Sequence, residues 1–403
     1  MHQPLGAGII AAGYIQKLSG RKTMQRYLTG SLLAILIGSL LSGCGGKETS
    51  DNTQSSASIK SVHAAYQPDH HYKKIKKSEF HRLVSFGDSL SDAGTYKVGT
   101  ISAFGGGQFT VNSSNTRIWT TIIAEKLGLN PPCAAQTGLD GDPALGLSAM
   151  PPVNHPECTN YAQGGARVTN PVGIGNKLTG GANASLGFLT VPVMQQIQNH
   201  LDAHHDKFDE EDLVTVMAGA NDIFFQLALM QAGATDPTTA FVSITNAADE
   251  LAGAIKTNII GKGAKHVVVL NIPDIAITPM SRGFDVQTLG LIDAMVQTFN
   301  YQLFLGLQNN THVLYIDAYA DSYSQYTNPG AYGLTNVTDT ACDLTPEKNF
   351  LGSSLICSSS NLAANATNTF MFADMVHPTP YGHSLIAKLV SNSMRENGWI
   401  KHH

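Results

Sequence analysis

Short apolar runs rich in β-branched residues recur between longer segments with helical periodicity, and this alternation restricts the fold more than any other feature. The runs are HRLVSFGD (81–88), LVTVMAG (213–219), HVVVLNIP (266–273) and HVLYIDA (312–318). Near-continuous apolar runs of this length are typical of parallel strands that are buried on both faces. We expect a weaker fifth strand near Cys158–Ala162.

Helical patterns lie between and after these runs, at 119–128, 193–204, 247–263, 286–309 and 381–397. Strands that alternate with helices form a parallel sheet with helices on both faces. No internal repeat or change of composition divides the chain after residue 80, so we expect one domain over 80–399. Its surplus length lies in two loops, 99–157 and 319–373. The fold class is therefore α/β, a three-layer α/β/α sandwich around a parallel sheet of about five strands.

The first 43 residues have the layout of a secretory signal. An apolar core from Tyr27 to Leu41 follows a segment that is free of Asp and Glu. At about 15 residues the core is shorter than the roughly 20 that a spanning helix needs, which favours a cleaved signal over a permanent anchor. We expect translation to start at Met24, because a signal peptide that begins there has a more usual length. The cationic residues of the segment are Lys17, Arg21, Lys22 and Arg26.

The apolar core ends in Leu41-Ser42-Gly43-Cys44, which resembles the lipobox of bacterial lipoproteins. In that motif, cleavage before the cysteine frees its thiol for a diacylglyceryl group. We therefore expect 1–43 to be a signal peptide and Cys44 to be lipidated, with 44–79 as a solvated tether. The resemblance implies export and attachment to the bacterial cell envelope, at the outer membrane or the cell surface.

Net charge restricts the partners. The signal segment carries four positive charges, so its removal would change the formal net charge of the chain from −5 to −9. An acidic chain is a poor candidate for binding nucleic acid or for electrostatic adsorption to anionic lipid. We expect no nucleic-acid partner, membrane contact through more than one acyl chain of the lipid anchor, and a monomer.

Four cysteines remain besides Cys44, and export makes disulfides the expected state of Cys133, Cys158, Cys342 and Cys357. Of the three possible pairings, the sequence-local Cys133–Cys158 and Cys342–Cys357 carry the smallest loop-closure entropy, and we expect these two. The sequence has neither CxxC nor HExxH spacing and no glycine-rich nucleotide motif, so we expect no metal ion and no cofactor.

Polar residues follow the expected strands at the edge where open parallel sheets bind ligands. Ser89 follows the first run, Gly165 the weaker strand and Asn221 the run that ends at Gly219. Asp374 and His377 stand three residues apart just before the last helical pattern. A hydroxyl, a histidine and a carboxylate are the groups that turn an alcohol into a nucleophile.

Sequence blocks around these residues resemble, in order, those of the GDSL or SGNH family of serine esterases and lipases. The blocks are GDSLSD (87–92), NYAQGGA (160–166), GAND (219–222) and DMVHPT (374–379). The likeness runs over 81–390, and the chain lacks the GxSxG elbow of the other large serine esterase fold. It implies a flavodoxin-like fold and a serine carboxylester hydrolase. Two further stretches resemble the bacterial branch of lysophospholipases, phospholipases A and haemolysin-like lipases: NTRIWTTIIAEKLG (115–128) and NPGAYGLTNV (328–337).

The resemblance implies a role for each of these residues. Ser89 would attack the ester carbonyl, His377 would take its proton, and Asp374 would orient and stabilise the imidazolium. The N–H groups of Ser89 and Gly165 and the side-chain amide of Asn221 would bind the developing oxyanion. A helix that begins near Ser89 would add its dipole.

Each of these roles has a competitor. Ser91 is the alternative nucleophile and Gly164 the alternative oxyanion donor, but Ser89 and Gly165 match the motif positions. We expect Asp92 to cap the helix start and Asp222 to order the loop after the strand. Four nearby aromatic residues are expected in the core, with an acyl pocket as the alternative: Phe224, Phe225, Phe370 and Phe372.

The expected substrate is an acyl-ester lipid, chiefly a lysophospholipid or phospholipid. An acyltransferase and a short-chain or polysaccharide esterase are alternatives with the same mechanism, because any nucleophile that outcompetes water can take the acyl group. A non-catalytic surface adhesion lipoprotein is the alternative of a different class. The Cys342–Cys357 loop lies just before Asp374, where it would act either as a lid or as a staple.

Replacing Cys44 tests the lipid anchor. Because serine lacks the thiol that takes the diacylglyceryl group, Cys44→Ser should release the protein from the membrane fraction or stall its processing. Membrane fractionation with mass measurement of the N-terminal peptide is the check. An unchanged membrane fraction with an intact N-terminus would point to a spanning segment instead.

Overall fold

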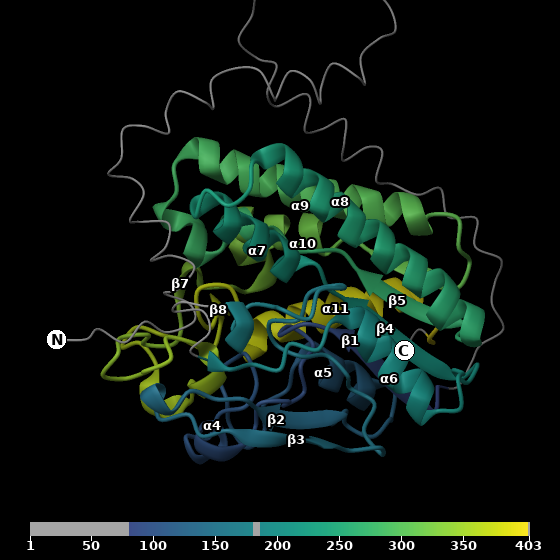
Figure 1. Cartoon of the computed structure of the whole chain (residues 1–403), viewed down its shortest axis with the longest axis horizontal. Helices are drawn as coiled ribbons and strands as arrows, with labels where there is room; N and C mark the ends of the chain where they lie inside the picture. Colours follow the sequence, from purple (N-terminus) through teal and green to yellow (C-terminus); the bar gives the residue numbers. More distant parts are fainter. Residues whose placement is uncertain (1–79, 180–185, 402–403) are drawn as a thin grey trace, which may run out of the picture. The chain divides into compact units, whose positions relative to one another are not determined.

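The computed structural model describes residues 80–179 and 186–401, and its central sheet has four parallel strands in the order β1-β4-β5-β6 (Figure 1). All four coincide with the predicted apolar runs. They are almost entirely buried, as continuous apolar sequences predict. The expected signal segment, Cys44 and the tether lie outside the described residues. The strands are β1 (Arg82–Gly87), β4 (Asp212–Met217), β5 (His266–Leu270) and β6 (Val313–Ile316).

The expected fifth strand exists only as a short parallel bridge at the outer edge of β1. Ser85 and Asn160 form this bridge, and Tyr161 donates its N–H to the carbonyl of Ser85 at 2.8 Å. Gln163 donates to the carbonyl of Gly87, and the chain then turns away at 164–165. The sheet is therefore a four-stranded one with an edge bridge, because the segment leaves β1 after a few residues.

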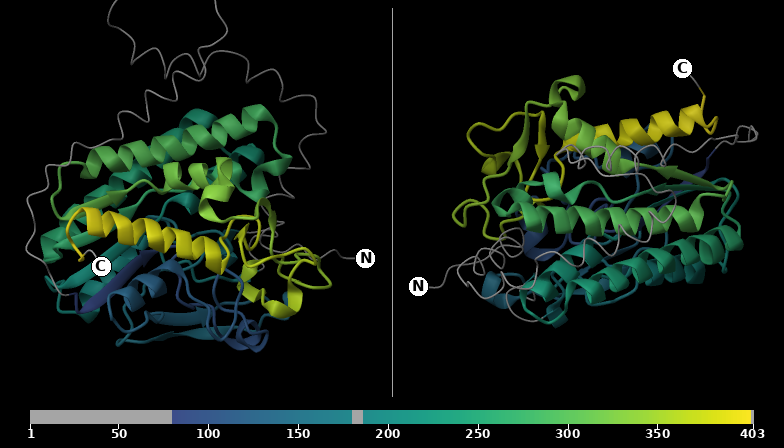
Figure 2. Two further views of the ribbon diagram at one scale, coloured as in Figure 1. Left: turned by 180° about the vertical axis from the view of Figure 1, so that it is seen from behind. Right: turned by 90° about the horizontal axis from the view of Figure 1, so that it is seen from above.

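Helices cover both faces of the sheet, which confirms the predicted three-layer α/β/α sandwich. Val84 packs with α6, α7, α8 and α9, whereas its neighbour Leu83 packs with α5 and α11 on the opposite face. Successive strand residues point to opposite faces, so each strand serves both layers. Figure 2 shows α11 on the other side of the sheet from α8 and α9. The helices are α5 (Trp119–Lys126), α6 (Val193–Ala203), α7 (Ala220–Gln231), α8 (Pro237–Ala254), α9 (Val286–Leu307) and α11 (Pro380–Glu396).

Side chains cap the first turns of α8, α9 and α11. The carboxylate of Asp285 accepts the Thr288 N–H ahead of α9, and the Thr379 hydroxyl accepts the Gly382 N–H ahead of α11. Helix α8 starts at Pro237, well before the predicted residue 247, because Asp236 caps it and proline is favoured at the first helical position. A π-helical turn (Ile255–Ile259) and a 3₁₀ turn (Ile260–Lys262) extend it toward β5.

The two long loops contain short elements that the sequence pattern did not indicate. They hold α4 (Gly99–Ala103), α10 (Ala318–Thr327), an antiparallel pair of strands and a parallel pair. Both sequence-local disulfides are formed, Cys133–Cys158 in the first loop and Cys342–Cys357 in the second. The paired strands are β2 (Gln136–Leu139) with β3 (Met150–Asn154), and β7 (Asn336–Thr340) with β8 (Phe370–Phe372).

Over 80–179 and 186–401, none of the helices combines the length and the apolar character that crossing a bilayer requires.

Candidate active site

The structure brings Ser89, His377 and Asp374 into one hydrogen-bonded chain. Ser89 lies in the turn after β1, and the other two lie in the loop before α11. The Nε2 atom of His377 is 2.9 Å from the Ser89 hydroxyl, and its Nδ1 atom is 2.8 Å from each carboxylate oxygen of Asp374. Because an ionised carboxylate only accepts, Nδ1 carries the proton and Nε2 accepts from the hydroxyl. This arrangement can take up the proton of Ser89.

Asp374 is almost completely buried, at 2% exposure, yet its charge is well compensated. The Ser354 N–H donates to one carboxylate oxygen at 2.7 Å, and the N–H groups of Val376 and His377 donate to the other at 3.0 and 2.9 Å. Burial alone would raise the pKa of this carboxyl. The attraction of His377 and these hydrogen bonds outweigh burial and hold the pKa below its ordinary value, so Asp374 stays ionised.

Ser89 does not begin a helix, which corrects the expectation of a helix dipole there. Residues 89–91 form a turn, and the first helix of the described chain, α4, begins only at Gly99. The turn is closed by Asp88, whose carbonyl accepts the Ser91 N–H and whose side chain accepts the Leu90 N–H at 3.1 Å. A short polar side chain that binds the backbone in this way favours a turn over a helix.

Asp92 is likewise not a helix cap. Its buried carboxylate accepts the N–H groups of Gly94, Thr95 and Gly164, at 2.8, 2.7 and 2.9 Å. Burial raises its pKa to about 6. Asp92 therefore links the turn after β1 to the glycine pair Gly164–Gly165. Because its carboxylate binds the Gly164 N–H, that N–H is not free to bind an oxyanion, as the alternative would require.

Three donors remain beside the Ser89 hydroxyl. Within the described ranges, neither the Ser89 N–H nor the Gly165 N–H donates a hydrogen bond to another protein atom. The Nδ2 atom of Asn221 donates one hydrogen to the Ala166 carbonyl at 2.9 Å and has a second to offer. Ser89, Gly165 and Asn221 line the same cavity. Their placement suits binding of an oxyanion.

Glycine is required at position 165. Its φ is +79°, in the left-handed region, and a Cβ atom there would lie 2.1 Å from the Ile174 carbonyl oxygen. A side chain at this position would displace the donor.

Ser91, the alternative nucleophile, is fully buried and lies against Trp119. Its hydroxyl accepts the indole N–H at 3.2 Å. His377 forms its hydrogen bond with the Ser89 hydroxyl instead. The geometry therefore favours Ser89 over Ser91.

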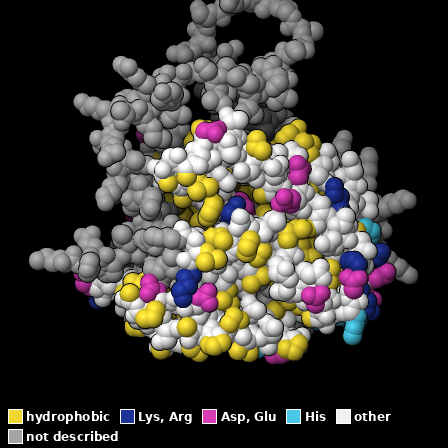
Figure 3. Space-filling model, viewed as in Figure 1, with side chains coloured by type: hydrophobic (Ala, Val, Ile, Leu, Met, Phe, Trp, Pro, Cys, Tyr) yellow, Lys and Arg dark blue, Asp and Glu magenta, His cyan; other side chains and the backbone are white. Residues whose placement is uncertain are grey.

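A cavity of about 210 Å³ lies along the carboxyl ends of the four strands. Its lining includes Ser89 after β1, Asn221 after β4, Asp274 after β5 and Ala318 after β6. The cavity is therefore lined by residues from the ends of four neighbouring strands. Hydrophobic side chains are more frequent than Lys or Arg on the face that carries α7 (Figure 3). The apolar lining includes Leu90, Phe109, Phe188, Phe224, Leu227, Met280, Phe372, Ile386 and Leu389.

The aromatic residues that were expected in the core divide into two groups. Phe224 is half-buried and lines the cavity, whereas Phe372 is buried in a core cluster, as expected, and also lines the cavity. Phe370 is buried, and the Phe225 ring lies 4.2 Å below the Arg167 guanidinium. The apolar residues of α7 are spread around the helix, so periodicity could not separate cavity-facing from core-facing positions.

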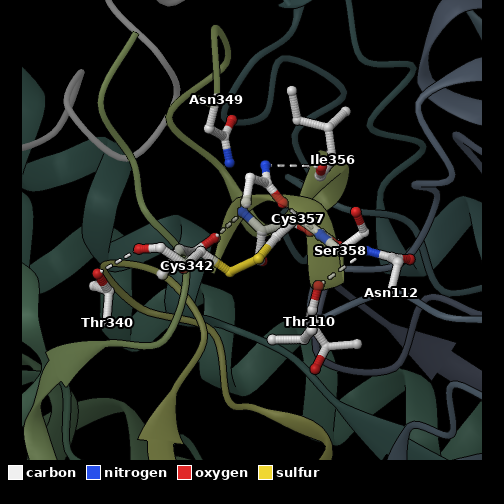
Figure 4. The surroundings of a disulfide bond; sticks show 12 residues. Thr110, Asn112, Thr340, Cys342, Asn349, Ile356, Cys357 and Ser358 are labelled. Carbon is white, nitrogen blue, oxygen red and sulfur yellow. Dashed lines mark hydrogen bonds between the residues drawn. A yellow bond between two sulfur atoms is a disulfide. The ribbon is translucent and has the colours of Figure 1, made fainter. Parts of the chain in front are cut away.

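The second half of the loop closed by the Cys342–Cys357 disulfide, residues 349–357, is mostly buried, and Figure 4 shows its contacts around the disulfide. Asn112 donates through Nδ2 to the carbonyls of Ser354 and Cys357, at 3.0 and 3.1 Å. Leu355 is buried, and its carbonyl accepts the Gly107 N–H. Because the Ser354 N–H also binds Asp374, this loop supports the site. Ser354 was not a predicted site residue, and a backbone donor in a loop leaves no signal in the sequence.

Phe109 is a second residue that the sequence did not single out. Its ring centroid lies 4.9 Å from that of His377, and it lines the cavity. It limits the space in which the imidazole ring can turn. Among the described residues, no group of three or more His, Cys, Asp or Glu is placed to hold a metal ion.

Residues 83–390 match the family model described as GDSL-like Lipase/Acylhydrolase. The chain is 23% identical to lipase 1 of Photorhabdus luminescens, over 77% of this chain and 49% of that one, so it spans about half the length of that relative. It is 26% identical to the GDSL esterase/lipase At5g55050 of Arabidopsis thaliana, over 64% and 73%. Among solved structures, two catalytic mutants of Axe2, an acetylxylan esterase from Geobacillus stearothermophilus, match with a TM-score of 0.36. The matches cover 82% of this chain and 100% of each Axe2 chain, at 14% and 15% sequence identity.

Removing the Cys342–Cys357 disulfide tests whether its loop is a staple or a lid. For a 15-residue loop, the Cys342→Ser, Cys357→Ser change should lower the free energy of unfolding by about 3 kcal/mol. Because the loop holds the Ser354 N–H against Asp374, kcat/KM should fall by the same factor for long-chain and short-chain esters.

The matched control is the Cys133→Ser, Cys158→Ser change, which removes the other disulfide and should lower Tm with little loss of kcat/KM. The measurements are Tm and the ratio of the two kcat/KM values. A changed ratio at an unchanged Tm would identify the loop as a lid.

Proposed function

Since the chain belongs to the GDSL-like lipase/acylhydrolase family, we propose that it is a serine carboxylester hydrolase that cleaves acyl esters of lipids, chiefly lysophospholipids and phospholipids. The observation that carries the proposal is the hydrogen-bonded chain from Asp374 through His377 to Ser89, which lines a mostly apolar cavity. The residues of the chain supply a nucleophile, a base and a buried counter-charge in contact.

The first half of the reaction makes an acyl-enzyme. The Ser89 oxygen attacks the ester carbonyl while its proton passes to Nε2 of His377, and the ionised Asp374 stabilises the resulting imidazolium. The C–O bond to the leaving alcohol then breaks, and the same Nε2 proton passes to the alcohol oxygen. The acyl group remains on Ser89.

The second half releases the acid. Water attacks the acyl-enzyme carbonyl and gives a proton to Nε2 of His377, and the bond to the Ser89 oxygen breaks. The proton returns to Ser89, and the carboxylic acid leaves. In both halves the carbonyl oxygen becomes negative, and the N–H groups of Ser89 and Gly165 and the Asn221 amide stabilise it, each by about 3–4 kcal/mol.

The cavity supports a lipid acyl chain as the group that is transferred. It passes the carboxyl ends of all four strands, and much of its lining is aliphatic or aromatic. An extended chain with its carbonyl at Ser89 would bury apolar surface along this path, worth roughly 25 cal/mol per Å². An acetyl group would leave most of this surface without a partner.

The lipidated Cys44 belongs to the same proposal. Two or more acyl chains on the anchor would hold the enzyme at a membrane of the cell envelope, where lipid esters are concentrated. The enzyme would act there as a monomer and without a metal ion or cofactor.

Ser89→Ala tests the nucleophile. The variant should keep the wild-type Tm and lose nearly all ester hydrolysis, because no other hydroxyl is bonded to Nε2 of His377 in the described structure. A fluorophosphonate probe should label the wild-type protein only, while Ser91→Ala serves as the control that retains labelling. Labelling of the Ser89→Ala variant would place the nucleophile elsewhere.

A panel of esters from acetyl to long-chain lysophospholipid, with purified 45–403, tests the substrate class. We expect kcat/KM to rise with the length of the acyl chain. Activity should persist in excess EDTA, because the proposed mechanism uses no metal ion. Phe224→Ala should reduce this preference about 10-fold by removing apolar contact, whereas Tyr323→Ala on the exposed face of α10 should not. A maximum at acetyl esters would favour the short-chain or polysaccharide esterase, and transfer to an added alcohol in preference to water would favour the acyltransferase.

A further inference from the structure

The two oxyanion donors outside the Ser89 turn lie on different segments, so their relative position has to be fixed. Gly165 belongs to the irregular segment after the edge bridge of β1, and Asn221 lies in the first turn of α7. The carbonyl of Gly165 accepts the Ile174 N–H at 3.0 Å. A first hydrogen bond joins the two segments, from Asn221 Nδ2 to the Ala166 carbonyl.

Asp222, next to Asn221, makes two further links to the same segment. Its carboxylate accepts the Nε–H of Arg167 at 3.1 Å through one oxygen and the N–H of Val168 at 3.0 Å through the other. The guanidinium of Arg167 also lies 4.2 Å above the ring of Phe225, on the same helix. Arg167 is therefore held to α7 by an ion pair with Asp222 and by a cation–π contact with Phe225.

The ion pair is buried, with Asp222 3% and Arg167 8% exposed. A buried charge pair adds little net stability compared with apolar packing, but loss of one partner leaves an uncompensated charge. The other side of the segment is fixed independently, because the carbonyls of Arg167 and Val168 accept the N–H groups of Val193 and Met194 at the start of α6. Asp222 is thus the charged contact that sets the segment against α7.

We infer that Asp222 is a positioning residue for the oxyanion site. Through Arg167 and the Val168 N–H, it holds the Gly165 N–H at the right place relative to the Asn221 amide. Asp222 itself does not line the cavity and does not touch the reacting atoms. The inference rests on the proposed function, since it assigns Asp222 a task in binding the oxyanion that forms on the ester carbonyl.

Asp222→Asn is the sharpest test, because asparagine keeps the size of the side chain and an oxygen for the Val168 N–H but removes the charge opposite Arg167. We expect kcat to fall about 100-fold, as a small displacement of the catalytic groups predicts. KM should stay within about twofold, because the donors act on the transition state. A long-chain trifluoromethyl ketone, whose adduct with Ser89 carries an oxyanion, should lose affinity by a similar factor.

The matched control is Asp212→Asn. Asp212 is 1% exposed and accepts from Nε and Nη2 of Arg82 at 2.9 and 2.7 Å, at the start of β4, the opposite end of the strands from Ser89. This variant also removes the charge of a buried carboxylate that pairs with an arginine, although Arg82 is partly exposed, so it should lower Tm while kcat and ketone affinity stay within about twofold of the wild type. Arg167→Gln should reduce kcat like Asp222→Asn, and the double variant should lose no more than either alone.

Two results would overturn the inference alone. The first is an Asp222→Asn variant with wild-type kcat and ketone affinity beside an inactive Ser89→Ala variant. The second is a loss of kcat in both variants, Asp222→Asn and Asp212→Asn, that follows the decrease in Tm of each. An active Ser89→Ala variant would instead overturn the proposed function together with the inference.

Discussion

The burial of one ionised carboxylate, that of Asp374, organises the whole site. A carboxylate removed from water is stable only when its oxygens accept several hydrogen bonds. Three backbone N–H groups and the ring of His377 meet this requirement, and one of the N–H groups comes from the disulfide-closed loop. Packing of that loop on Asn112 therefore fixes the carboxylate, the carboxylate fixes the imidazole, and the imidazole selects Ser89.

The parallel sheet explains why distant parts of the chain meet at this place. Each strand of such a sheet ends at the same edge, so residues that follow β1, β4, β5 and β6 line one cavity. Buried carboxylates tie the connecting segments together behind that edge: Asp92 holds the glycine pair, and Asp222 holds the segment that follows it. Catalytic geometry here depends on charged contacts that never reach the substrate.

The layers, the strands and the Ser89–His377–Asp374 group could be predicted from the sequence, because long apolar runs and ordered motif blocks leave strong local signals. The helix expected near Ser89 is absent, since the carboxylates of Asp88 and Asp92 accept backbone N–H groups and form turns there. Helix α7 was missed because its apolar residues do not gather on one side, which leaves only a weak helical periodicity. The Ser354 donor and the supporting role of its loop depend on tertiary packing, which no local pattern records.

The central claim is that Ser89 carries the acyl group during turnover, and intact-protein mass spectrometry after rapid quench tests it most directly. With a slowly deacylated long-chain ester, the account predicts a burst of alcohol release and a mass increase equal to the acyl group. Peptide mapping should place that group on Ser89. Turnover in a single phase with no covalent adduct, or an adduct on another residue, would contradict the account.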